Sequence, residues 1–129
     1  MGYTGFLAVG IGGMLGCWLR WWLAVVFNPL FPTLPLGTLA ANLLGGFLMG
    51  LTLGVFDHFQ TLPVEARLLV ATGFLGGLTT FSTFSAETTA LLLRQQYGWF
   101  AAHVGLNLAG SILMTIAGLG IARGVLKHF

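Results

Sequence analysis

The sequence has very little charge. Among its 129 residues, five are Lys or Arg and three are Asp or Glu, which together make 6% of the chain, against about 25% in an ordinary soluble domain. Hydrophobic residues make up 57%. This composition excludes a soluble domain, and five basic residues are too few to form a face that binds nucleic acid. We therefore interpret the chain as an integral membrane protein surrounded by lipid.

Cysteine and acidic side chains are also scarce. Cys17 is the only cysteine, which excludes an intrachain disulfide and a cysteine-based zinc motif. The acidic residues are Asp57, Glu65 and Glu87, and all of them lie near the ends of apolar runs. No set of nucleophile, base and orienting residue can be assembled from this sequence, so we do not expect an enzyme.

Four apolar runs are long enough to cross a membrane, which requires roughly 20 apolar residues. We expect a single all-α domain over residues 1–129 with spans at about residues 5–27, 37–56, 64–94 and 98–124. The first run is too long for a cleaved signal peptide, so the N-terminus is expected to be retained. The link at 28–35 contains three prolines, which end the first helix.

The third run contains an unusual stretch at residues 73–87. Glycines at 76 and 77 predict a helix break near residues 76–79, and hydroxyl and aromatic side chains follow. Backbone that leaves the helix at membrane depth is tolerated only inside protein or along a water-filled path, and interrupted helices often hold ions in transport proteins. We interpret this stretch as the functional part of the molecule.

Polar side chains recur in the neighbouring spans. Asn42 stands alone in the second span, and the fourth span has a polar stripe at steps of four, formed by His103, Asn107, Ser111 and Thr115. Such residues more often join helices by hydrogen bonds than bind a substrate. Their coincidence with a broken helix favours function, because amide and hydroxyl donors receive anions. Phenylalanine rings at 81 and 84 present positive edges that attract a small anion.

Arg20 and the other cations leave the orientation in the membrane undecided. Arg20 is either an anchor that reaches the interface or a cation at the mouth of an anion path. Four spans place Arg67, Arg123 and Lys127 on one side, and Arg20 and Arg94 on the other. This bias is too small to fix one orientation. It permits an antiparallel homodimer, the two-chain equivalent of an inverted repeat.

The chain resembles the Fluc/CrcB family of fluoride channels over nearly its whole length. The most specific part is the run from Gly76 to Ser85, GGLTTFSTFS. Weaker similarity lies in each of the other spans, at Gly12, Gly13, Gly16, Arg20, Gly37, Thr38, Leu39, Asn42, Gly45, Phe47, Gly50, Asn107 and Gly110.

The resemblance implies a dual-topology homodimer in a bacterial inner membrane, with two antiparallel pores that passively export fluoride and protect the cell from it. It implies that Phe81 and Phe84 line the fluoride path, that Asn42 is the main donor, and that Thr38, Ser82 and Ser111 add hydroxyls. The backbone carbonyls of Gly76 and Thr79 from both subunits would hold a structural sodium ion, with no organic cofactor. The resemblance also implies positions on the vestibule or polar track for Arg20, Glu87, Thr88, His103 and Asn107.

Two rival interpretations remain. A small four-helix multidrug exporter coupled to protons needs a carboxylate deep in the membrane, but the first span has no acid, and Glu87 near the end of the third is the only candidate. A packing subunit without transport would explain the glycines but neither the polar stripe nor the break.

Overall fold

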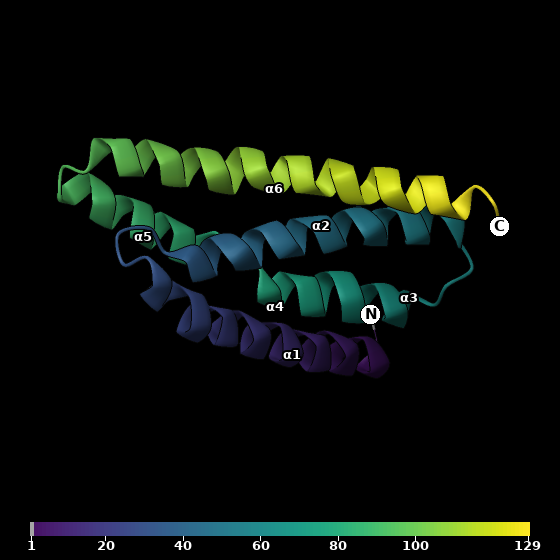
Figure 1. Cartoon of the computed structure of the whole chain (residues 1–129). Helices are drawn as coiled ribbons and strands as arrows, with labels where there is room; N and C mark the ends of the chain where they lie inside the picture. The colour runs from purple at the N-terminus through teal and green to yellow at the C-terminus, as the bar shows by residue number, and fades with distance from the viewer. Residues whose placement is uncertain (1) are drawn as a thin grey trace.

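The computed structural model describes residues 2–129, and this part of the chain is entirely helical apart from short connections. Four helical runs are long and apolar enough to cross a membrane: Tyr3–Leu30, Leu36–His58, Val64–Leu93 and Tyr97–Leu126. They lie alongside one another with both termini at the same end (Figure 1). The prediction of an all-α protein with four spans is confirmed.

Each of the four runs consists of one or more helical elements. The first run is α1 (Tyr3–Phe27) with the 3₁₀ turn η1 (Asn28–Leu30), and the second is α2 (Leu36–His58). The third is composite: α3 (Val64–Arg67), the π-helical segment η2 (Leu68–Leu75), α4 (Gly76–Leu78) and, after the break, α5 (Ser82–Leu93). The fourth is α6 (Tyr97–Leu126).

Glycines bring the helices into backbone contact. A Cβ on Gly77 would lie 2.5 Å from the carbonyl oxygen of Gly13 on α1, and one on Gly46 would lie 2.8 Å from the carbonyl oxygen of Ser111 on α6. No real Cβ approaches a carbonyl oxygen so closely. The small residues therefore allow α1 to pack along the third run, and α2 along α6, as close packing in membranes requires.

The break in the third span lies later than the sequence indicates. Gly76 and Gly77, expected to interrupt the helix, are helical, and the non-helical residues are Thr79, Thr80 and Phe81. Thr79 is extended, with φ −85° and ψ 156°. The predicted break is present, but it is shifted towards the C-terminus, because Gly77 provides space for α1 while the helix ends where a side chain of α2 takes over the backbone bonds of Thr80.

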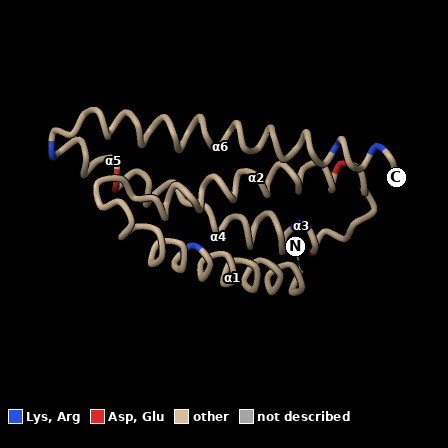
Figure 2. The backbone as a smooth tube through the Cα atoms, in the orientation of Figure 1, with Lys and Arg blue, Asp and Glu red and all other residues tan. Residues whose placement is uncertain are grey.

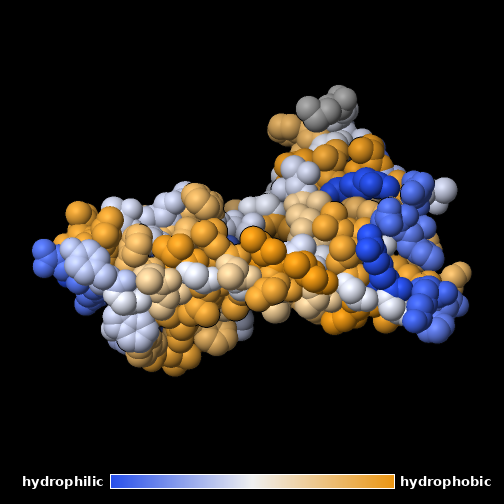
Figure 3. Space-filling view, turned by 90° about the horizontal axis from the view of Figure 1, so that it is seen from above, coloured by the Kyte–Doolittle hydropathy of each residue, from blue (hydrophilic) through white to orange (hydrophobic). Residues whose placement is uncertain are grey.

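The surface matches a membrane environment. Figure 3 shows hydrophobic residues over most of the visible face and hydrophilic ones gathered towards the two ends. In Figure 2 the cations lie towards both ends of the bundle, apart from Arg20, which lies within α1. Among residues 2–129 the exposed large apolar side chains outnumber the buried ones. The buried core cluster is small, consisting of Leu23, Ala41, Leu75 and Leu78. The protomer therefore exposes most of its apolar surface, as a protein in lipid does.

Candidate functional site

A pocket of about 210 Å³ opens beside the break in the third span. The rings of Phe81 and Phe84 meet there edge to face, with centroids 5.5 Å apart and planes at 61°. Phe84 is 6% exposed, whereas Phe81, which precedes α5, is 71% exposed. The pocket is lined by Asn42, Thr79, Thr80, Phe81, Phe84, Asn107, Leu108 and Ser111.

Asn42 bonds the backbone at the break in the third span. Its Oδ1 accepts a hydrogen bond of 2.9 Å from the backbone N–H of Thr80, and its Nδ2 donates to the Thr80 carbonyl at 3.1 Å. The same Nδ2 donates to Oδ1 of Asn107 at 2.9 Å. The side-chain amide thus replaces the helical partners of Thr80, which satisfies backbone groups that would otherwise be unpaired at membrane depth.

The hydrogen-bond network continues from Asn107 to a buried histidine and a carboxylate. Nδ2 of Asn107 lies 3.1 Å from Nδ1 of His103 and donates to the His103 carbonyl at 2.9 Å. Nε2 of His103 lies 3.2 Å from Oε1 of Glu87, and the hydroxyl of Thr38 donates to the other carboxylate oxygen at 2.7 Å. His103 is fully buried. The structure therefore joins in one network residues whose roles the sequence left separate.

Arg20 lies inside the protein surface and caps the broken helix. Its Nε donates to the carbonyl of Gly77 at 3.1 Å, an oxygen that has lost its helical donor because Phe81 is not helical. Arg20 and Glu87 also line a second cavity, of about 300 Å³, beside the break. The hydrogen bond to Gly77 ties the Arg20 side chain to the break, and whether Arg20 is an interfacial anchor or a cation at the mouth of an anion path stays a prediction.

Two further carbonyls at the break have lost their helical donors. In a continuous helix, the N–H of Thr80 would bond the carbonyl of Gly76, and that of Thr83 would bond the carbonyl of Thr79. The Thr80 N–H instead bonds Asn42, and the Thr83 N–H bonds the hydroxyl of Thr80 at 3.1 Å. Gly76 and Thr79 line one cleft of about 270 Å³. Free carbonyl oxygens suit a hard cation.

Three remaining candidates occupy different places. Ser111 lines both the phenylalanine pocket and the carbonyl cleft. The hydroxyl of Ser82 lies 3.4 Å from that of Thr80, and Ser82 is exposed and outside the pocket lining. Thr88 is buried and donates to the carbonyl of Phe84 at 2.6 Å. Of these residues, Ser111 alone lines the phenylalanine pocket.

Sequence reasoning missed two contributors to the site. Thr80 acts through its backbone, for which a sequence gives no signal. Thr115 was recognised only as a member of the polar stripe, and its hydroxyl donates to the carbonyl of Gly46 across the α2–α6 contact at 2.9 Å. Thr115 lies four residues after Ser111 and so on the same helix face, and this spacing was the sequence signal for that contact.

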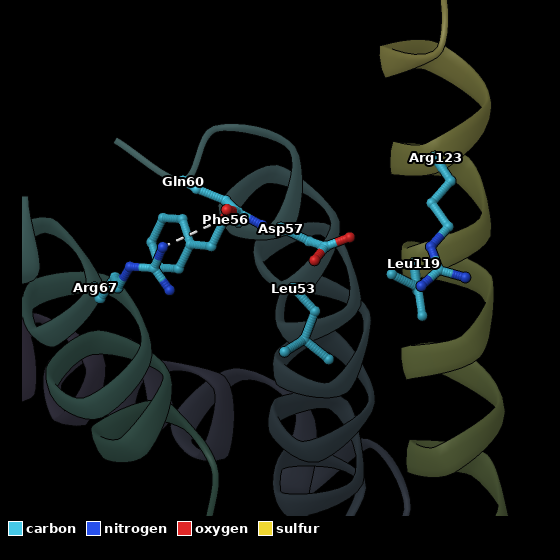
Figure 4. A pocket seen from close by; sticks show the side chains of 7 residues that line it. All are labelled: Leu53, Phe56, Asp57, Gln60, Arg67, Leu119 and Arg123. Carbon is cyan, nitrogen blue, oxygen red and sulfur yellow. Dashed lines mark hydrogen bonds between the residues drawn. The ribbon is translucent and has the colours of Figure 1, made fainter. Parts of the chain in front are cut away.

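Another cleft, of about 630 Å³, lies elsewhere, at the end of the bundle that carries both termini. In Figure 4 its side chains project from α2, the connection that follows α2, α3 and α6, and Arg67 donates to the carbonyl of Phe56. The Arg67 guanidinium lies 5.2 Å from the centre of the Phe56 ring. None of its lining residues belongs to the polar network of Asn42, Asn107, His103 and Glu87. The lining consists of Leu53, Phe56, Asp57, Gln60, Arg67, Leu119 and Arg123.

Comparison with known proteins identifies the family of this chain. The model of the CrcB-like protein, Camphor Resistance (CrcB) family matches residues 7–119. The chain belongs to this family. It is 56% identical over 128 residues to a protein of Nitrosospira multiformis named fluoride-specific ion channel FluC, covering 99% of this chain and 100% of that one. It is 59% identical over 123 residues to the protein of the same name from Cupriavidus necator, covering 95% and 98%. The family resemblance is thereby confirmed.

Proposed function

We propose that this protein is a fluoride-selective ion channel that lets fluoride leave the cytoplasm passively and so protects the cell. The observation that carries the proposal is the pocket in which the Phe81–Phe84 pair meets the amides of Asn42 and Asn107. The family relationship gives the ion, since the relatives are named fluoride-specific channels. It is a multi-pass protein of the bacterial inner membrane, and a channel is not an enzyme.

The pocket suits passage of a small anion because it offers partial charges and no fixed cation. Ring edges are weakly positive, and amide and hydroxyl hydrogens are donors. Arg20 lies next to the pocket in the second cavity, and does not line it. Conduction requires binding strong enough for entry and weak enough for release, and this balance follows from many weak donors. Ser111 adds a hydroxyl within the pocket, and Thr38 and Glu87 line the second cavity beside it. Ser82, exposed outside the pocket, would add a hydroxyl at the approach to it, and Thr88 lies one turn beyond Phe84.

The functional unit is an antiparallel homodimer in lipid with two pores. One protomer exposes the Phe81 ring and offers the free carbonyls of Gly76 and Thr79 in an open cleft. Carbonyls from a second copy would complete a cation site, and the oxygen ligands fit a structural sodium ion. Residues 2–129 contain no cluster of three or more His, Cys, Asp or Glu side chains that could hold a metal ion. The nearly even distribution of Lys and Arg permits both orientations.

The structure offers little support for a proton-coupled multidrug exporter. Such a protein needs a carboxylate for which proton and substrate compete. The carboxylate of Glu87 is instead bonded on one oxygen by Thr38 and lies beside His103 on the other. The family relationship also points to a channel.

The deciding experiment is anion efflux from proteoliposomes that contain only this protein. Fluoride and chloride are loaded together, each is followed with its ion-selective electrode, and valinomycin with potassium carries the compensating current. We expect rapid fluoride release with chloride retained. If folded, dimeric protein released neither ion, the channel proposal would be wrong, and export of an aromatic cation against a proton gradient would be assayed next.

The role of the rings is tested by Phe81→Ile and Phe84→Ile. Isoleucine keeps much of the bulk and removes the polar ring edge, an interaction of about 1 kcal/mol per contact, so fluoride efflux should fall about fivefold in each variant. Phe6→Ile, at an exposed ring far from the pocket in α1, is the matched control. Unchanged efflux in both pocket variants, with the dimer intact, would refute the ring-edge mechanism.

A further inference from the structure

The hydrogen bonds of the polar network run from donor to acceptor in one order only, and the backbone N–H of Thr80 sets that order. The N–H of Thr80 can only donate, so the Asn42 atom that faces it at 2.9 Å must be Oδ1. Nδ2 of Asn42 then faces Asn107, which must present its own Oδ1 as the acceptor at 2.9 Å. The orientation of both amides is therefore fixed from the helix break outwards.

The same reasoning determines the state of His103. With Oδ1 of Asn107 used towards Asn42, its Nδ2 faces Nδ1 of His103 at 3.1 Å. Nδ1 must then be an acceptor without a proton, so the neutral ring carries its hydrogen on Nε2 and donates to Glu87 at 3.2 Å. The network is thus complete only with His103 neutral.

This arrangement leaves no spare amide donor for an anion. Nδ2 of Asn42 is bonded to the Thr80 carbonyl and to Asn107, and Nδ2 of Asn107 to the carbonyl and Nδ1 of His103. Each NH₂ group has two hydrogens. A fluoride ion in the pocket must therefore displace an acceptor of Asn42, and the side-chain amide of Asn107 is more easily moved than the Thr80 backbone.

We propose that His103 is a positioning residue whose protonation turns Asn107 and frees the amide donors of Asn42 and Asn107 for fluoride. This inference rests on the proposed channel function. A proton on Nδ1 makes that atom a donor, so Asn107 turns its Oδ1 towards His103 and its NH₂ group towards the pocket. Asn42 loses its acceptor on Asn107, and N–H groups of both amides then face the anion.

The two arrangements are balanced by contacts that the structure shows. When the Asn107 amide turns, it loses its hydrogen bond to the His103 carbonyl. This loss favours the arrangement seen in the structure, in which all amide hydrogens are bonded, while the His103 ring is neutral. The charged ring gains from the Glu87 carboxylate, with which it forms an ion pair when protonated. Arg20, which shares the cavity of Glu87, opposes that gain, and α2 contributes only the neutral Thr38 and Asn42 near the pair. The protonation of His103 therefore decides between the two arrangements.

The test is fluoride efflux from proteoliposomes measured at a series of pH values on both sides of neutrality. Protein-free vesicles at each pH give the leak of undissociated acid, which is subtracted. We expect wild-type efflux to rise about tenfold as the pH falls, the ratio equivalent to one ordinary hydrogen bond. His103→Gln should remain low at every pH, because a neutral amide can accept from Asn107 and donate to Glu87.

Matched controls are His58→Gln and His128→Gln, which replace exposed histidines away from the network. Both should keep the wild-type pH profile. A wild-type profile that is flat, or a profile that persists in His103→Gln, would overturn the proposal. Absence of fluoride efflux at any pH would instead count against the channel function itself.

A spectroscopic measurement judges the inference independently of transport. In protein with ¹⁵N-labelled histidine in lipid, NMR should show the neutral His103 ring with Nε2 protonated and Nδ1 bare, and the ring of the fluoride-accepting arrangement with both nitrogens protonated. Fluoride should increase the doubly protonated fraction at a given pH, because an anion that prefers one arrangement shifts the population towards it. An Nδ1–H tautomer at high pH would refute the hydrogen-bond direction.

Discussion

Replacing Gly118 by alanine should separate α2 from α6. A Cβ at this position would overlap the carbonyl oxygen of Phe47 and lie 3.0 Å from the Leu51 nitrogen and 3.2 Å from the Cα of Gly50, whereas ordinary contact begins at 3.4 Å. These atoms belong to backbone and cannot swing aside like a side chain. The two helices must therefore move apart by roughly 1 Å at this point.

The magnitude follows from two losses. Overpacking of a close contact costs about 1–3 kcal/mol. The hydrogen bond from Thr115 to Gly46, one turn away across the same contact, is 2.9 Å long and would stretch, at a cost of about 0.6 kcal/mol in a membrane. We expect Gly118→Ala to lower the free energy of unfolding by about 2–3 kcal/mol relative to a matched glycine-to-alanine change.

The matched changes are Gly120→Ala and Gly124→Ala. Both lie in α6 with nothing within 4 Å of an added Cβ, so they gain the same helix propensity, about 1 kcal/mol, without the overlap. Unfolding is followed by tryptophan fluorescence in mixed micelles as the fraction of denaturing detergent increases. Equal stability of the three variants would refute the conclusion that backbone contact at Gly118 holds α2 against α6.

Two further predictions concern helix contact and orientation. Thr115→Val should destabilise the protein by about 0.6 kcal/mol more than Thr52→Val in the same unfolding assay, because the Thr115 hydroxyl bonds Gly46 on another helix while that of Thr52 bonds only its own helix. Equal effects would contradict that assignment. Changing Gln60 and Thr61 in the α2–α3 connection to lysine should fix one orientation and abolish efflux by that chain alone, with recovery when a chain fixed in the opposite orientation is coexpressed. Full efflux from a population shown by cysteine labelling to have one orientation would refute the antiparallel dimer.

The helices and their membrane location could be predicted because they depend on local properties. Length and apolarity define a span whatever its neighbours are, and prolines mark the end of the first helix whatever it packs against. The stripe from His103 to Thr115 was visible because its spacing fixes one helix face. Its contact with α2 was left open, since many arrangements of four helices satisfy the same pattern.

The position of the break shows where local reasoning fails. Glycine suggested an interruption at Gly76 and Gly77, yet both are helical. The helix ends three residues later because Asn42, far away in the sequence, offers one acceptor and one donor to the backbone of Thr80. A glycine is equally compatible with a helix break and with a close contact between two helices. Which of the two it forms depends on the neighbouring helix.

The sequence by itself determined that this protein lies in a membrane, has four spans, is related to the CrcB-like family, and has candidate anion donors at Asn42, Phe81 and Phe84. The tertiary structure decided how those residues act together. It joined Asn42, Asn107, His103 and Glu87 into one network with a fixed direction. The reason is that spacing along one helix is a local property, whereas the direction of a hydrogen bond depends on which donor or acceptor another segment brings to the same place.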